Sequence, residues 1–141
     1  MASQLDLDQG GTYRQWVRRF LGPSVGWVWT PEDNVLPVVL GGTTTVIQGT
    51  TLVQVSVNGA VTIQLPSAKA STTSVAGALP GTFLALPVTV VDIGGFAASH
   101  NITILPFGAE TIMGLASIAI TAAYGGFTLT PNITAGGWNT Q

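Results

Sequence analysis

Hydrophobic and polar residues alternate along most of the chain after residue 34, with the period of two that is typical of β-strands. The alternation is strictest over 52–57, where valine occupies every second position, and over 61–65, where valine, isoleucine and leucine do. The segment 114–124 is rich in alanine, but its alternating isoleucines favour a strand over a helix. The predicted strands cover residues 35–40, 44–48, 52–57, 61–65, 82–92, 101–105, 111–113, 117–121 and 126–129.

Short turns separate these strands. Asn58-Gly59 lies between two of them and is a strong signal for a two-residue hairpin turn. Residues 69–81 are small and polar and are predicted to form a long surface loop. Strands recur at roughly the 8–12-residue spacing of sandwiches and barrels. The predicted fold of residues 36–141 is therefore all-β, a single β-sandwich or barrel-like domain of short antiparallel strands.

The first part of the chain differs in composition and is predicted to form an N-terminal docking arm, residues 1–35, with a short amphipathic helix. Apolar residues over 13–21 recur at the i, i+3, i+4, i+7 and i+8 positions of one helical face, and arginines occupy the opposite face. Thr12 is a candidate N-cap and Gly22-Pro23 ends the helix. Such a short helix is marginal alone in water, so we expect it to dock on other protein.

The arm contains the residue types that dominate binding energy at protein interfaces, namely tryptophan, tyrosine and arginine. One interpretation is that these residues dock onto a partner, and the other is that the helix packs against its own domain with a solvated polar face. The candidate docking residues are Tyr13, Arg14, Trp16, Arg18, Arg19, Phe20, Trp27 and Trp29.

Charge is scarce in this chain. Only 7% of the residues are charged, 46% are hydrophobic, and the formal net charge is −2. Soluble domains usually contain about 25% charged residues, so either threonine, serine, asparagine and glutamine solvate the surface or much of it faces other protein, and both interpretations suit a component of a stable assembly. The net charge provides no basic field for nucleic acid, and no apolar run reaches the ~18 residues of a membrane span. The chain has no cysteine, which excludes disulfides and thiolate chemistry.

Few residues offer catalytic chemistry. His100 lies in a predicted turn, and Asp92 and Glu110 are the acids of the β-rich region. A β-sandwich hydrolase using Asp92, His100 or Glu110 can be composed, but no nucleophile motif such as G-x-S-x-G accompanies them. The Gly-Gly pairs precede no phosphate-binding helix. We therefore predict no enzyme activity, no cofactor and no metal site.

Trp138 follows a Gly-Gly pair near the end of the chain and has two interpretations. Its ring could stack on a sugar as a ligand contact, or it could close the β core as a plug. The sequence favours the plug, because no second exposed aromatic and acid pair is expected beside it.

A resemblance to a known family rests on three stretches, VNGAVTIQLPSA (57–68), VTVVDIGGFAASHNITILPFGAETIMG (88–114) and AAYGGFTLTPNITAGGW (122–138). They look like a β-module family of phage virion proteins that is shared by capsid decoration (cement) proteins, head fibres and tail fibres. The resemblance implies a β-rich module, commonly trimeric, that is displayed on a virion and has no catalytic activity.

Together these observations predict a non-enzymatic structural protein on the outer surface of a bacteriophage particle. A short chain with a docking arm and one β module best suits a trimeric capsid decoration (cement) protein or short head fibre that docks on the shell. Its expected partners are copies of itself and the major capsid protein or other virion proteins. The alternative is a tail fibre or receptor-binding module that recognises host surface glycans, through loops such as 69–81 or around Trp138.

Overall fold

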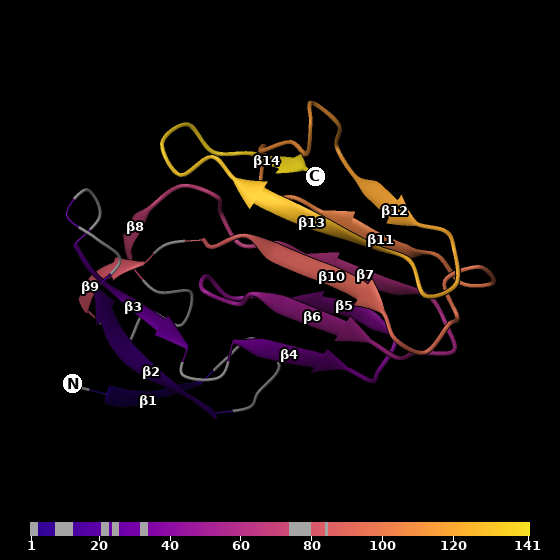
Figure 1. Ribbon diagram of the computed structural model, residues 1–141, viewed down its shortest axis with the longest axis horizontal. Coiled ribbons are helices and arrows are strands. Elements are labelled where there is room, and N and C mark those ends of the chain that lie inside the picture. The colour runs from indigo at the N-terminus through magenta and orange to yellow at the C-terminus, as the bar shows by residue number, and fades with distance from the viewer. Residues whose placement is uncertain are drawn as a thin grey trace.

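The computed structural model describes the backbone of residues 3–7, 13–20, 23, 26–31, 34–73, 80–83 and 85–141, and the side chains of 23, 26, 34–70 and 85–141. The described residues form strands and turns without a helix, in three sheets (Figure 1). Sheet A has the order β1 (Ser3–Leu7), β2 (Tyr13–Phe20), β3 (Trp27–Pro31), β9 (Pro80–Phe83), β8 (Ser71–Thr73). Sheet B has the order β14 (Trp138–Thr140), β13 (Gly126–Pro131), β10 (Val88–Asp92), β6 (Leu52–Val55), β4 (Val35–Val38). Sheet C has the order β12 (Ile118–Ile120), β11 (Ile102–Leu105), β7 (Val61–Gln64), β5 (Gly42–Thr45).

Sheets B and C are built from three successive rungs of a parallel solenoid. Each rung places one strand in sheet B and the next strand in sheet C: β4 then β5, β6 then β7, β10 then β11. Strands of the same sheet therefore pair in parallel from rung to rung. A parallel pair needs a long crossover connection, and here the strand of the opposite sheet supplies it.

The register stacks hydrophobic residues into rows that face the space between the two sheets. In sheet B, Leu36, Val53 and Val90 are aligned, and in sheet C Ile63 aligns with Ile104. The valines of the central strands and both isoleucines are buried. Aligned β-branched and aliphatic side chains on one face stabilise neighbouring strands by their mutual packing. The core of the solenoid thus follows directly from the alternation in the sequence.

The later strands reverse direction and close one end of the solenoid. Strand β13 is antiparallel to β10, β14 is antiparallel to β13, and β12 is antiparallel to β11. Their buried side chains, with that of Ile112, belong to the hydrophobic core. The buried residues contributed by this cap are Ile112, Ile120, Leu129 and Trp138.

The all-β prediction is confirmed, but the predicted helix over 12–21 is wrong. Residues Tyr13–Phe20 form strand β2, which pairs antiparallel with β1 on one side and with β3 on the other. The segment also contains three aromatic residues and Val17, and these residue types favour strands. Two hydrogen-bonded neighbours outweigh the weak helical preference of a segment this short.

The predicted hairpin at Asn58-Gly59 and the antiparallel pairing of the central strands are also wrong. Strands β6 and β7 flank this turn, but β6 lies in sheet B and β7 in sheet C. Each strand instead pairs in parallel with a strand of the next rung, and the buried faces of β6 and β7 then meet across one core. The described sheets remain separate in this arrangement and form no closed barrel.

A tight turn at Ile112–Leu115 carries an unusual residue. The N–H groups of Ile112 and Leu115 each donate to the other residue's carbonyl, at 2.9 Å. Met113 has a φ of 50° and Gly114 a φ of 81°, which is the geometry of a type I′ turn. Asparagine is favoured at the first central position of this turn, whereas a left-handed φ is costly for methionine.

Met113→Asn is therefore expected to stabilise the protein by roughly 0.5–1 kcal/mol. The Met113 side chain is 60% exposed, so its removal sacrifices little burial. The urea midpoint of the variant should rise relative to the native chain. Leu115→Asn is the control, because Leu115 is similarly exposed, at 56%, without a positive φ. A Met113→Asn midpoint at or below the native value would show that the methionine side chain contributes more than the strain costs.

Candidate functional site

A buried carboxylate lies at the end of strand β10. Asp92 aligns with Val55 and Val38 in the rows of sheet B, and its exposed fraction is 1%. Its Oδ1 accepts the backbone N–H of Gly95 at 3.0 Å, and its Oδ2 accepts those of Ala97 at 2.9 Å and Tyr124 at 3.2 Å. Asp92 therefore ties the β10–β11 loop to the β12–β13 turn.

The pKa of Asp92 lies below its ordinary value. Burial alone would raise this pKa, but hydrogen bonds from the backbone N–H groups of Ala97, Tyr124, Phe96 and Gly95 stabilise the charged form and outweigh burial. A carboxylate that is ionised and enclosed by backbone donors is a structural anchor. It is not placed to exchange a proton with a substrate.

Tyr124 and Gly95 pack against each other beside Asp92, at the edge of the solenoid where β10 ends. Tyr124 has a φ of 59°, and its ring lies directly on Gly95, where an added Cβ would come within 2.6 Å of the ring. Gly95 itself has a φ of 77°, so both its conformation and its lack of a side chain are needed there. The Tyr124 ring is nevertheless 70% exposed, and it forms a rigidly held aromatic surface.

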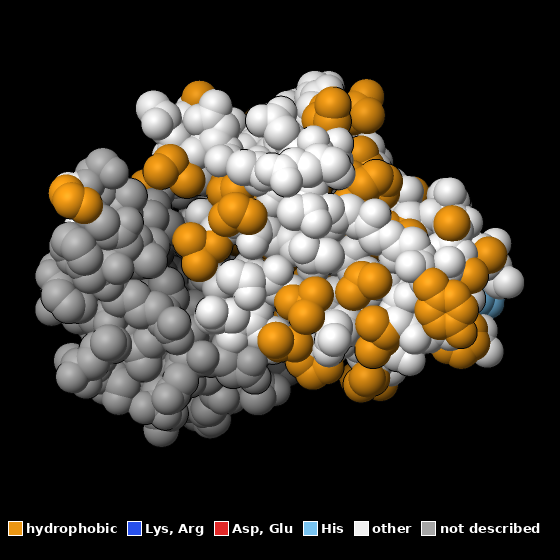
Figure 2. Space-filling view, viewed as in Figure 1, with side chains coloured by type: hydrophobic (Ala, Val, Ile, Leu, Met, Phe, Trp, Pro, Cys, Tyr) orange, Lys and Arg blue, Asp and Glu red, His pale blue; other side chains and the backbone are white. Residues whose placement is uncertain are grey.

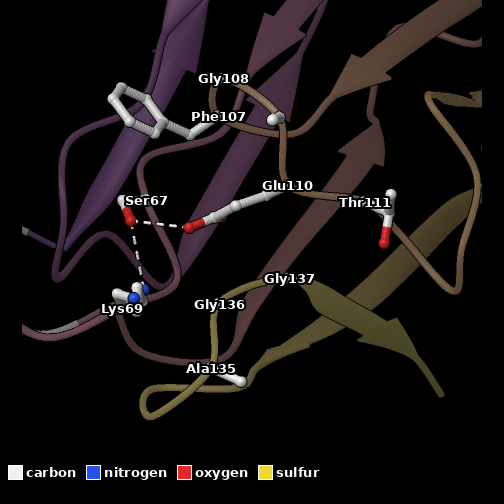
Figure 3. Close-up of a pocket in the computed structure, with 10 residues that line it drawn as sticks. Ser67, Lys69, Phe107, Gly108, Glu110, Thr111, Ala135, Gly136 and Gly137 are labelled. Atoms are coloured by element: carbon white, nitrogen blue, oxygen red, sulfur yellow. Dashed lines mark hydrogen bonds between the residues drawn. The ribbon is translucent and has the colours of Figure 1, made fainter.

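A second carboxylate borders a cavity of about 470 Å³ (Figure 3). We call this cavity the Glu110 pocket. Glu110 points toward Ser67 in the close-up, and its Oε1 accepts the Ser67 hydroxyl at 2.8 Å while its Oε2 accepts the Ala68 N–H at 3.0 Å. The lining residues are Ser67, Lys69, Phe107, Gly108, Ala109, Glu110, Thr111, Ala135, Gly136 and Gly137.

Two further hollows adjoin the Glu110 pocket. A cavity of about 580 Å³ shares residues 108–111 with it and extends to Gln64 and Leu105. A smaller one, of about 200 Å³, shares Thr111 and Gly136-Gly137 and extends to Asn132 and Asn139. Serine, threonine, asparagine and glutamine are prominent in these walls, and Phe107 adds an exposed ring at 53%. These adjoining hollows are thus lined by a mixture of polar and apolar groups, with Lys69 and Glu110 as the charged residues of their walls.

The candidate catalytic residues do not gather into one site. Asp92 is buried at the end of β10, Glu110 follows β11 and bonds to Ser67 and Ala68, and His100 is exposed in the β10–β11 loop. Among the described residues no group of three or more histidine and acidic side chains could hold a metal ion. The described residues also contain no helix long and apolar enough to cross a membrane.

Exposed apolar side chains gather where the chain crosses between sheets B and C. Val39 and Leu40 follow strand β4, Ile93 follows β10, and Tyr124 precedes β13. The register aligns the ends of β4, β6 and β10, so the turns after β4 and β10 lie at the same edge of the solenoid, with the β6–β7 turn between them. Their exposed fractions are 68%, 78%, 49% and 70%. We call these four residues the turn edge.

Figure 2 shows hydrophobic side chains spread over the described face, without a lysine, arginine or acid in view. Within the parts whose side chains are described, the charged residues are Lys69, which is exposed, Asp92, which is buried, and Glu110, which is half-buried. The described surface therefore has few of the charged side chains that usually solvate a protein surface.

The predicted docking residues lie on strands β2 and β3 of sheet A. The backbone register pairs Arg18 with Trp29 and Phe20 with Trp27. Strand β3 also pairs with β9, so residues of the predicted arm and of segment 71–83 share one sheet. The side chains of the eight predicted docking residues lie outside the described residues.

Trp138 lies in the core, with an exposed fraction of 2%. This is the position expected for a plug, and it leaves no open ring face for a sugar. Sequence reasoning missed the bonded pair Ser67 and Glu110, which lie 43 positions apart and carry no local signal. The anchoring role of Asp92 had a signal, namely a lone acid ending a valine-rich strand before Gly94-Gly95.

Comparison of the chain with protein-family models and with curated proteins found no match.

Proposed function

We propose that this protein is a non-enzymatic structural component of a bacteriophage virion, most consistent with a trimeric capsid decoration (cement) protein or short head fibre on the outer surface. Copies of the chain associate with one another, and the trimer docks on the major capsid protein or another virion protein. The turn edge is the observation that supports this proposal best. Two of its four exposed apolar residues follow the first rung's β4, one follows the third rung's β10 and one lies in the β12–β13 turn, in a described surface with few charged residues.

Physical reasoning connects the turn edge to assembly. Burying exposed apolar surface contributes about 25 cal/mol per Å², and large exposed apolar patches are uncommon on monomers. The solenoid fixes the turns on hydrogen-bonded strands, so little conformational entropy is lost when a partner covers them. The carboxylates of the described solenoid are occupied by backbone or serine donors, which supports a scaffold more than a catalyst.

The alternative function is a tail fibre or receptor-binding module for host surface glycans. It would use the same scaffold but would need a sugar site. The Glu110 pocket is the described feature that such a module would use.

The mass of the full-length protein in solution tests the assembly proposal. Multi-angle light scattering should give three times the 14.5 kDa chain mass. Leu40→Glu should shift the protein to the monomer, because an unpaired charge in an apolar interface costs several kcal/mol. Ser117→Glu introduces the same charge at an exposed position directly before strand β12, outside the turn edge. This variant should leave the trimer intact. A native monomer at all concentrations, or a trimeric Leu40→Glu variant, would contradict the proposal.

A further inference from the structure

The Glu110 pocket has the size and rigidity of a ligand site. Its volume of about 470 Å³ falls within the ~300–1,000 Å³ range of small-molecule sites. The Glu110 N–H donates to the Phe107 carbonyl at 2.9 Å, which closes the turn that carries both side chains. The Gly136 N–H likewise donates to the Asn132 carbonyl at 2.8 Å and fixes the opposite wall. The site is therefore largely pre-formed.

Glu110 retains acceptor capacity on the pocket side. A carboxylate oxygen can accept about two hydrogen bonds, and the described residues supply one to each oxygen, from Ser67 and Ala68. The Ser67 hydroxyl also accepts the backbone N–H of Lys69 at 3.3 Å, so the whole wall is held in place. The remaining lone pairs are available to donors on a ligand.

Gly136 keeps this carboxylate accessible. A Cβ at this position would lie 2.9 Å from Oε1 of Glu110 and 3.3 Å from Cγ of Lys69. The backbone there has a φ of 89°, which glycine adopts without strain. Glycine thus leaves open the space in front of the one acidic group of the pocket.

The lining selects the chemistry of the ligand. An anion would meet the Glu110 carboxylate, and Lys69 is the one cationic side chain of the lining to offset it. A purely apolar ligand would cover the Lys69 ammonium, the Thr111 hydroxyl and the acceptor capacity of Glu110 that Ser67 and Ala68 leave unused, which is costly. A neutral compound with several adjacent hydroxyls satisfies these groups, because each hydroxyl both donates and accepts.

We propose that the Glu110 pocket binds a neutral carbohydrate. A pair of sugar hydroxyls donates to Glu110, Lys69 donates to a sugar oxygen, and the apolar face of the sugar ring packs on Phe107. The adjoining hollows, with Gln64, Asn132 and Asn139 in their walls, give room for neighbouring sugar units. The site rests on the pocket alone, so it holds for a decoration protein and for a receptor-binding module alike.

An array of neutral and acidic glycans, probed with the full-length protein, tests this site. Neutral glycans should be bound and their acidic counterparts rejected. The best neutral binder is then titrated by calorimetry against three variants whose fold is checked by circular dichroism. Phe107→Ala and Glu110→Gln should each weaken binding at least tenfold. His100→Ala, which removes an exposed side chain outside both the Glu110 pocket and the turn edge, should bind as the native chain does.

Several outcomes would overturn the carbohydrate site. These are the absence of any bound glycan on the array, a preference for acidic glycans, binding that survives both pocket variants, and capture of peptides at the pocket in place of sugars. None of these outcomes depends on oligomeric state. A native monomer that binds the glycan would contradict the assembly proposal and leave the carbohydrate site standing. A trimer that binds no glycan would contradict the carbohydrate site and leave the assembly proposal standing.

Discussion

Asp92→Asn is expected to destabilise the protein by about 2 kcal/mol near neutral pH, and Asp92→Ala by at least about 3 kcal/mol. The carboxylate accepts three backbone N–H groups from two separate loops, and it is 1% exposed. An amide keeps one acceptor oxygen and turns an NH₂ group toward backbone donors, while alanine leaves all of the donors without their partner. The free energy of unfolding from urea titrations measures both effects.

The contribution of Asp92 should depend on pH with a definite sign. Because the folded-state pKa of this group is lowered, its stabilisation is fully present above the unfolded-state pKa of about 3.9 and is lost as the pH falls through the folded-state value. The difference in unfolding free energy between the native chain and Asp92→Asn should therefore be largest at neutral pH. Below about pH 4 that difference should shrink.

The difference between the two proteins is the quantity to measure, since other acidic residues titrate equally in both. A difference that stays constant from pH 7 to pH 2.5 would contradict the ionised anchor. The affected region can also be located. Hydrogen exchange of the Gly95, Ala97 and Tyr124 amides should accelerate in Asp92→Asn, whereas the amide of Leu65, which donates to Leu105, should be protected as long as the fold persists.

Strand positions were readable from the sequence because alternation is a local signal. Strands β4, β6, β7, β11 and β12 lie within the ranges that alternation predicts, and the alanine-rich segment 114–124 does contain a strand. Parallel pairing was not readable, because the same alternation is compatible with a hairpin and with a crossover between sheets. The choice between a hairpin and a crossover depends on pairing with the neighbouring rungs and on the core that the two sheets share. Neither is visible in the sequence of one pair of strands.

The errors in the first part of the chain have a related cause. Residues 13–20 fit both a helical face and a strand, and their neighbours β1 and β3 decide between the two. The predicted surface loop 69–81 likewise contains β8, and β9 begins at its end, because strand β3 offers β9 a partner. Pairing partners distant in sequence leave no trace in the local pattern.

The candidate site was only partly predictable for the same reason. Glu110 and Phe107 lie in a turn that the sequence marks with glycine and proline, but Ser67 and Gly136 reach it from two other turns. Trp138 drew attention to the correct region, because it contributes to the wall of the smallest hollow, although it is only 2% exposed. The exposed aromatic ring beside the Glu110 pocket is that of Phe107, and not that of the buried Trp138.

Trp138→Ala is expected to cost roughly 3–5 kcal/mol, because the ring is 2% exposed and fills the cap end of the core. Loss of a large buried side chain removes its contacts and leaves a cavity that rigid strands cannot collapse. Trp138→Phe is the matched variant. Among the described residues no polar atom bonds to the indole Nε1, so phenylalanine gives up volume without giving up a hydrogen bond.

The phenylalanine variant should therefore lose less than about 2 kcal/mol, and urea midpoints measure both variants. The pair also separates the two interpretations of this tryptophan. A stacking platform predicts that Trp138→Ala abolishes sugar binding at native stability. A core plug predicts the reverse, a large loss of stability in which any loss of binding follows unfolding. An alanine variant as stable as the native chain would therefore place the ring outside the core and reassign it as a ligand contact.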